Sequence, residues 1–266
     1  PAVARPMTGR PTLGADGRSI EALIVVGSRT DVGCIREGNE DAFCVVRSSD
    51  GRGLLLAAVC DGMGGHAAGE TASRLATEVL AAEYHRKPSE PGGSLAEAVR
   101  SANRAIYRAA RDDQALTGMG TTCTALAIQG GLVWCAHVGD SRCYLIRNGA
   151  ILLMTEDHSS VMALVRDGTI TASEARQHPD KNVILRALGS HPEVEVSTWP
   201  RPFVLQPGDR LLLCSDGLYD VVPADDILAS ARDVAPREAC DALIDLARER
   251  GAPDNVTAVM LAVPMV

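Results

Sequence analysis

The stretch of this sequence that most constrains the fold is an apolar run over residues 54–60 that ends in Asp61-Gly62. A run of this length predicts a buried strand, and a carboxylate at its end would be held rigidly at the edge of a core. Taken alone, Asp-Gly is most often a simple turn. Two further apolar runs also end in aspartate, at Asp140 and Asp216, so the sequence places several carboxylates at strand ends.

The composition is that of a globular protein with a sizeable core. Hydrophobic residues make up 46% of the 266 residues and charged residues 23%, which is an ordinary balance. No apolar run approaches the roughly 20 residues that cross a bilayer, so we expect no membrane segment. The formal net charge of −8 and the lack of a basic stripe argue against a nucleic-acid partner.

The cysteines predict a reducing, cytoplasmic location. None of the eight forms a Cys-x-x-Cys pair, and most lie in apolar strand-like runs. This pattern favours buried free thiols, with disulfides or a soft-metal site as the alternatives. Residues 1–18 are rich in Pro, Gly and Arg and contain no apolar segment. We therefore expect a flexible leader followed by a single domain over residues 19–266.

The order of patterns along the chain predicts an α+β fold. Apolar and alternating runs predict strands over 20–26, 42–46, 54–60, 121–129, 132–138, 143–147, 151–154, 210–214 and 256–263. Helical periodicity covers residues 70–87 and 224–231. Two further helices are predicted, one that begins at the capping box Ser94-x-x-Glu97 and one that runs from Pro236 to Gly251. The short connections after residue 121 predict an antiparallel meander. Antiparallel sheets, each covered on one face by helices, satisfy this order.

A polar stretch over residues 155–192 interrupts the strand pattern. It contains a second capping box, Thr171-x-x-Glu174, which predicts a short helix. We interpret this stretch as a surface insertion.

The acids at element ends have the chemistry of a site for hard cations. Carboxylates and carbonyl oxygens bind Mg²⁺ and Mn²⁺, whereas the six histidines show no zinc-binding spacing. Two such ions would make a reactive hydroxide near neutral pH and neutralise a phosphoryl group. Arg36 could grip phosphate oxygens. An acid at such a position, taken alone, is more often a turn or cap residue. The candidates are Glu40, Asp41, Asp61, Asp140, Asp216 and Asp254.

Six motifs in order resemble the metal-dependent PP2C-type (PPM family) serine/threonine protein phosphatases, particularly their bacterial branch. The resemblance covers about residues 27–263. The motifs are Arg36-x-x-Asn39-Glu40-Asp41, Asp61-Gly62-Met63-Gly64-Gly65-His66-x-x-Gly69-Glu70, Met119-Gly120-Thr121-Thr122, His137-Val138-Gly139-Asp140-Ser141-Arg142, Ser215-Asp216-Gly217 and Asp254-Asn255-Val256-Thr257. Any one of them is weak, but six in order are specific.

The resemblance implies a four-layer αββα sandwich in which two antiparallel sheets are flanked by helix pairs. It also implies two Mn²⁺ or Mg²⁺ ions, with a third in bacterial relatives. Residues 156–190 correspond to the flap that shapes substrate access. The implied ligand roles are Asp61 bridging two ions, the Gly62 carbonyl on one of them, Asp216 and Asp254 on the first, Glu40 on the second through water, and Asp140 with Asp216 on the third.

The resemblance further implies the reaction. Arg36 binds the substrate phosphate and Asp41 orients water, which attacks phosphorus directly with no phosphoenzyme. The substrates are phosphoserine and phosphothreonine proteins, and the physiological role is to counteract a bacterial Ser/Thr kinase. We expect a monomer. A catalytically weak regulatory or binding module is the alternative, and a metal-dependent nuclease is disfavoured by the net charge.

One position departs from the eukaryotic pattern. Met63 stands where those relatives carry a histidine proposed as the general acid. We therefore expect the leaving group to take its proton from a metal-bound water. His66 and His137 are expected to be structural.

Overall fold

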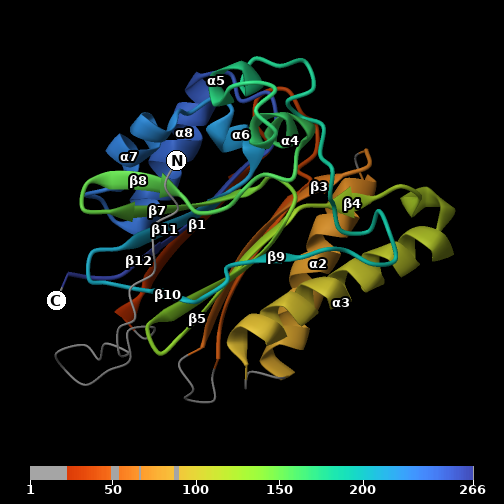
Figure 1. The fold of residues 1–266 in the computed structure, drawn as a ribbon, viewed down its shortest axis with the longest axis horizontal. Helices are drawn as coiled ribbons and strands as arrows, with labels where there is room; N and C mark the ends of the chain where they lie inside the picture. Colours follow the sequence, from red (N-terminus) through yellow and green to blue (C-terminus); the bar gives the residue numbers. More distant parts are fainter. Residues whose placement is uncertain (1–22, 49–53, 66, 87–89, 266) are drawn as a thin grey trace.

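The computed structural model describes residues 23–48, 54–65, 67–86 and 90–265. The predicted leader and His66 lie outside these residues. Two antiparallel sheets form the centre of the molecule (Figure 1). The first sheet has the order β1 (Val25–Asp31), β12 (Val256–Ala262), β11 (Arg210–Cys214), β7 (Arg142–Arg147) and β8 (Ala150–Leu153).

The second sheet contains the apolar run at its centre. Its order is β10 (Phe203–Val204), β6 (Leu132–Val138), β5 (Cys123–Gln129), β3 (Leu55–Met63) and β2 (Asp41–Arg47), with β4 (Gly120–Thr121) on β3 and β9 (Ser197–Thr198) on β6. Alternate residues of β3 enter two different cores. Leu55, Ala57 and Val59 face the other sheet, whereas Leu56, Ala58 and Cys60 face helices. Burial on both faces explains why the run is continuously apolar.

Helices cover the outer face of each sheet, as Figure 1 shows. The long pair α2 (Ala67–Arg86) and α3 (Pro91–Asp112) packs on the second sheet. Helices α6 (Asp216–Tyr219), α7 (Ala224–Ala231) and α8 (Pro236–Glu249) pack on the first. Three apolar cores between four layers result, which confirms the predicted αββα sandwich. None of the helices in the described residues is both long and apolar enough to span a membrane.

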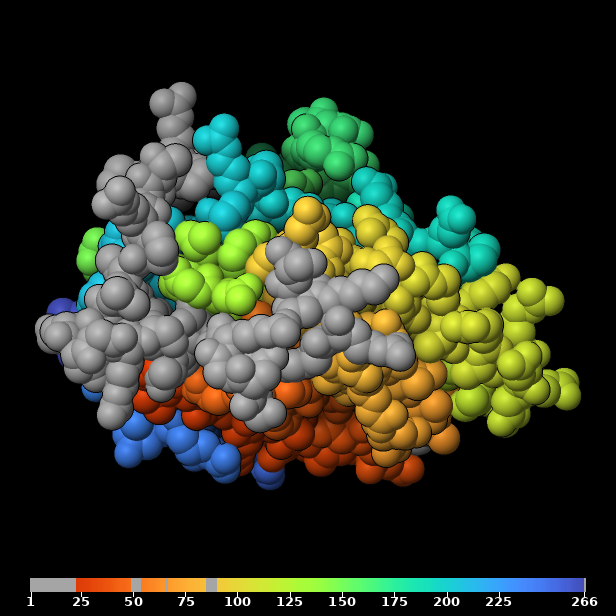
Figure 2. Space-filling view, turned by 90° about the horizontal axis from the view of Figure 1, so that it is seen from below, coloured from red at the N-terminus to blue at the C-terminus, as the bar shows by residue number. Residues whose placement is uncertain are grey.

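The remaining helices of the described residues are short; one follows α3 and two follow β8. The short helices η1 (Gln114–Leu116), α4 (Ser160–Arg166) and α5 (Ala172–Ala175) complete the described fold. Helix α5 begins with the predicted capping box, in which Thr171 and Glu174 bond each other's backbone N–H groups. Figure 2 shows the part of the chain near α4 and α5, in green, projecting from the body of the molecule. We call residues 156–190 the insertion segment.

The structure corrects four predictions of local structure. The first strand begins at Val25 instead of residue 20. Helix α3 begins at Pro91, so the Ser94 capping box lies inside the helix, because proline at the first turn already fits a helix start. Strand β3 continues through Asp61-Gly62 to Met63, where it pairs with β4, so this Asp-Gly is not a turn.

The fourth correction concerns the meander. Strands β6 and β7 belong to different sheets, and the three residues between them cross from one sheet to the other. The prediction failed because a short connection fixes neither hydrogen bonding nor sheet identity. Asp140 lies in this crossing. The β7–β8 turn is as predicted, since Asn148 and Gly149 both have positive φ angles, of 52° and 74°.

Candidate active site

The predicted acids gather at one end of the sandwich, and both sheets contribute to the cluster. Asp41 begins β2 and lies directly opposite Asp61 of β3 in the second sheet. Asp216 begins α6 just after β11, and Asp254 precedes β12; β11 and β12 are neighbouring strands of the first sheet. The charges of neighbouring carboxylates raise the pKa values of Asp41, Asp61 and Asp216, as expected for acids in one cluster.

Asp41 is held by hydroxyls from the opposite sheet. Ser215 and Thr257 donate hydrogen bonds of 2.7 and 2.6 Å to its Oδ2 atom. Its Oδ1 atom is buried and has no partner among the described residues. Burial raises the pKa of Asp41 to about 7, although the two hydroxyls lower it. One carboxylate oxygen is therefore fixed, and the other is left to accept a hydrogen bond from water or to bind a cation.

Threonines of the next strand hold the backbone around Asp61. The Asp61 N–H donates to Thr122 Oγ1 at 2.9 Å. The Asp61 carbonyl accepts from the Thr121 hydroxyl at 2.8 Å and from the Thr122 N–H at 2.9 Å. Thr122 Oγ1 in turn contacts Ser141 Oγ at 2.7 Å. The Met119–Thr122 motif therefore positions Asp61, a role that sequence reasoning did not assign.

Glycines allow Glu40 to approach the end of β3. The Gly62 N–H donates to the Glu40 carbonyl at 3.0 Å. A Cβ at Gly62 would collide with the carbonyls of Glu40 and Gly69, and a Cβ at Gly69 would collide with Glu40 Oε2. Only glycine fits at these two positions, because other backbone and a carboxylate fill the space that a side chain needs.

Asn255 fastens the loop that carries Arg36 and Glu40. Its Oδ1 accepts from the Glu40 N–H at 2.8 Å, and its Nδ2 donates to the carbonyls of Val32 and Gly38, both at 2.9 Å. Arg36 is half-exposed, and its Nη2 forms a 2.7 Å ion pair with Asp254 Oδ2. The structure thus brings the predicted phosphate-binding arginine against the predicted metal-binding acids.

Asp140 reaches the same end of the molecule from the crossing between the sheets. It is 5% exposed, and its Oδ1 atom has no partner among the described residues. Burial and the charges of Asp216 and Asp157 raise its pKa to about 8. Its backbone carbonyl accepts a 3.1 Å hydrogen bond from the Tyr219 hydroxyl.

The electrostatics of the cluster are unfavourable without cations. Burial and neighbouring carboxylates raise the pKa of Asp61 well above its usual range and that of Asp216 to about 6. Asp216 also has a buried Oδ1 without a partner in the described part of the chain. Buried carboxylates that lack hydrogen bonds are costly unless protons or cations neutralise them. The donor set, all oxygen, fits hard divalent cations.

The carboxylates alone do not provide a complete set of metal ligands. No group of three or more His, Cys, Asp or Glu side chains within the described residues is arranged to hold one ion by itself. Backbone carbonyls such as that of Gly62, and water, would therefore have to complete the ligand set of any ion bound here. This agrees with hard cations that keep several waters in protein sites.

The remaining sequence candidates take the following places. Met63 is the last residue of β3 and pairs with Gly120. His137 is 3% exposed, and its ring nitrogens contact Thr124 Oγ1 at 2.9 Å and the Glu156 carbonyl at 3.0 Å. The prediction that His137 is a packed residue is confirmed. Cys34 is exposed, Cys44 is partly buried and the other six cysteines are buried.

Comparison with known proteins identifies the family. A model of the protein phosphatase 2C family matches residues 34–255. The chain belongs to this family. It is 43% identical over 245 residues to the serine/threonine protein phosphatase PstP of Mycobacterium tuberculosis, covering 91% of this chain and 45% of PstP. It is 40% identical over 241 residues to the serine/threonine phosphatase stp of Listeria monocytogenes, covering 88% of this chain and 93% of stp.

Solved structures of this phosphatase family share the fold. The catalytic domain of PstP in complex with two manganese ions superposes with a TM-score of 0.79 at 40% identity, covering 91% of this chain and 98% of that structure. The chain therefore spans about half the length of the mycobacterial relative and nearly all of its solved catalytic domain.

Proposed function

We propose that this protein is a metal-dependent phosphatase that hydrolyses phosphoserine and phosphothreonine in proteins. The observation that carries the proposal is the cluster of buried carboxylates at the junction of both sheets, in which Asp41, Asp140 and Asp216 each keep an oxygen without a partner among the described residues. The named activities of the family relatives support it.

Divalent cations, Mn²⁺ or Mg²⁺, fit this cluster. We propose that two ions, and in addition a third ion, are held by the following groups: Asp61, the Gly62 carbonyl, Asp216, Asp254, Glu40, Asp41 and Asp140. The two manganese ions bound to the PstP catalytic domain support this number. When bound, such ions supply an acidified water and positive charge for a phosphoryl group.

The chain's own residues orient the reactants. Asp41 has one oxygen fixed by two hydroxyls, so its other oxygen can accept a proton from the attacking water at a defined position. Arg36 uses one donor on Asp254, which leaves further N–H groups of its planar fork for phosphate oxygens. In this proposal water attacks phosphorus in line and no side chain is phosphorylated.

The leaving serine or threonine oxygen needs a proton. In our proposal Met63 cannot supply one, because a thioether carries no acidic hydrogen. Water in the site is therefore the proposed donor. His137 is not the proposed acid, because both ring nitrogens already contact other groups, Thr124 Oγ1 and the Glu156 carbonyl.

The biological setting is a further part of the proposal. We propose that the substrates are phosphoproteins of a Ser/Thr kinase pathway, with the kinase itself among them. We also propose a cytoplasmic monomer, a single phosphatase domain over residues 19–266, and an insertion segment that acts as the flap over the substrate.

The test is phosphate release from a phosphothreonine peptide. Wild-type protein should turn over with Mn²⁺, and both EDTA and Asp216→Asn should abolish turnover. Circular dichroism and a melting curve confirm that the variant is folded. A folded wild type that shows no turnover with any divalent metal would favour the binding-module alternative. Turnover that survives EDTA and Asp216→Asn would mean that the metal assignment is wrong.

A further inference from the structure

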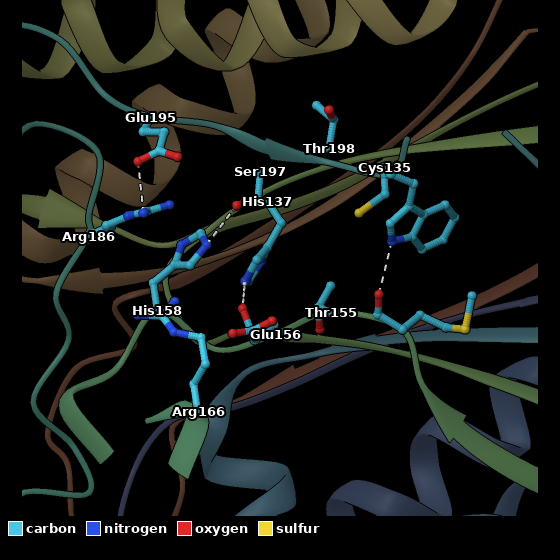
Figure 3. A pocket seen from close by; sticks show the side chains of 12 residues that line it. Cys135, His137, Thr155, Glu156, His158, Arg166, Arg186, Glu195, Ser197 and Thr198 are labelled. Atoms are coloured by element: carbon cyan, nitrogen blue, oxygen red, sulfur yellow. Dashed lines mark hydrogen bonds and ion pairs between the residues drawn. The ribbon is translucent and has the colours of Figure 1, made fainter. Parts of the chain in front are cut away.

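A cavity lies between the β6–β9 edge of the second sheet and the insertion segment. Its volume is about 390 Å³, within the range of small-ligand sites. One wall is the β6–β9 edge of the second sheet, where His137 lies opposite Ser197. The other walls are the stretch after β8 and the insertion segment, which contributes Arg166 and Arg186 (Figure 3). Of the residues that line it, none belongs to the acid cluster.

The apolar part of this cavity is fixed in place. Cys135, Met154 and Trp199 line it. The Trp199 indole N–H donates to the Met154 carbonyl at 2.9 Å, and its ring packs edge-on against Phe203 at 6.4 Å between ring centroids. A flat surface of this kind is preorganised for an aromatic or other planar apolar group.

The polar part of the cavity presents hydrogen-bond donors. The Gly139 N–H donates to His158 Nδ1 at 3.1 Å, so the proton of the neutral ring lies on Nε2. That Nε2 lies 2.9 Å from Ser197 Oγ and donates to it. The Ser197 oxygen therefore accepts this hydrogen bond, and the Ser197 hydroxyl proton can be donated to a ligand in the cavity. Figure 3 shows His158 pointing at Ser197 in the centre of the cavity.

The Thr155 hydroxyl, like that of Ser197, accepts a hydrogen bond within the protein. The donor is the Cys143 N–H, at 3.1 Å. The proton of the Thr155 hydroxyl can therefore be donated to a ligand.

The cavity lining carries two arginines, Arg166 and Arg186, and two carboxylates, Glu156 and Glu195. Arg186 forms a 2.8 Å ion pair with Glu195, whose side chain is 75% exposed and so strongly screened by solvent. Arg166 is 67% exposed, and its contact with Asp167 is 3.8 Å long. Each guanidinium has five N–H donors, so both can still bind an anionic group.

We propose that this cavity binds a small organic anion with a planar apolar body. The apolar body would lie on Trp199 and Met154. Its carboxylate, phosphate or sulfonate group would take hydrogen bonds from Ser197 and Arg186. The proposal does not depend on phosphatase activity.

The cavity is joined to the residue before Asp140 through His158. The His158 N–H donates to the Gly139 carbonyl at 2.8 Å, and the Gly139 N–H donates back to the His158 ring. A ligand that holds Ser197 and His158 together therefore also restrains the backbone contact between His158 and Gly139. We expect occupancy to slow hydrogen exchange of the Gly139 and His158 amides.

The probe for this site is 1-anilinonaphthalene-8-sulfonate, an anion with a planar naphthalene body whose fluorescence rises on binding. Titration of the whole protein, with calorimetry for stoichiometry, should show one saturable site. Arg186→Gln should weaken binding about tenfold, as expected for loss of a charge-assisted hydrogen bond. Ser197→Trp should abolish binding by filling the cavity.

Arg232→Gln is the matched control. Arg232 lines a different cavity, of about 600 Å³, near Arg147 and Arg210. The inference is supported if binding falls in Arg186→Gln and not in Arg232→Gln, in proteins whose melting curves match the wild type. It is overturned if Arg232→Gln alone weakens binding, if every variant binds like wild type, or if binding does not saturate. Unchanged exchange of the Gly139 and His158 amides at saturation would overturn the link to the Asp140 crossing.

Discussion

Replacing Thr257 by valine removes one of the two hydroxyls that hold the buried carboxylate of Asp41. The lost bond is 2.6 Å long and the second, from Ser215, remains. A hydrogen bond to a charged group contributes about 1.5–3 kcal/mol. Because it favours the ionised form, its loss raises the pKa of Asp41 by about one to two pH units.

The assay is the pH dependence of kcat/KM on a phosphothreonine peptide at saturating Mn²⁺. Asp41 must be ionised to accept a proton from water, so the acidic limb of the Thr257→Val profile should move upward by about one to two pH units. Cations lower the pKa of Asp41 in both proteins, so the difference between variants is the quantity to compare. Thr257→Ser keeps the hydroxyl and is the control. An acidic limb that stays in place in a folded Thr257→Val protein would refute the assigned role of Asp41.

Three further predictions test the surroundings of the site. First, burial lowers the pKa of His137 from 6.5 to about 4, so its stabilising contribution is complete above pH 6.5 and falls by about 3 kcal/mol as pH drops to 4. The free energy of unfolding, measured by urea denaturation as a function of pH, should show this loss in wild type and depend less on pH in His137→Gln. Second, Gly69→Ala should displace Glu40 and reduce Mn²⁺-dependent turnover about tenfold or more; equal turnover would show that Glu40 is dispensable or can move. Third, Arg142→Met leaves the buried Asp157 without its bidentate partner and removes the contact with Tyr219. It should cost about 3–5 kcal/mol of unfolding free energy, and a chemical denaturation midpoint that does not move would contradict this.

The sequence predicted the layers of the fold because periodicity reports burial directly. The strand with Leu55, Ala57 and Val59 on one face and Leu56 and Ala58 on the other is continuously apolar since it is buried on both sides. The helix over Ala224–Ala231 was predicted at its observed bounds. The sheet assignment of β6 and β7 could not be predicted, because it depends on which partners each strand finds far away in the sequence.

The acids of the site were predictable as residue types at element ends, but their supports were not. Ser215 and Thr257 reach Asp41 across 174 and 216 residues of sequence. Asn255 likewise fixes Glu40 from 215 residues away. Such contacts arise from the register of strands in two packed sheets, which no local pattern encodes. The ion pair between Arg36 and Asp254 is of the same kind, spanning 218 residues.

Calorimetric titration of Mn²⁺ into metal-free protein at pH 6 and pH 8, with wild type and Asp61→Asn, tests the central claim that the buried acids form a cation site. We expect at least two ions to bind the wild type, with higher affinity at pH 8, because the raised pKa values of Asp41 and Asp140, about 7 and about 8, make protons compete with the metal. Asp61→Asn should lose this binding. Folded wild-type protein that binds no Mn²⁺ at either pH, or Asp61→Asn that binds it equally well, would contradict the account.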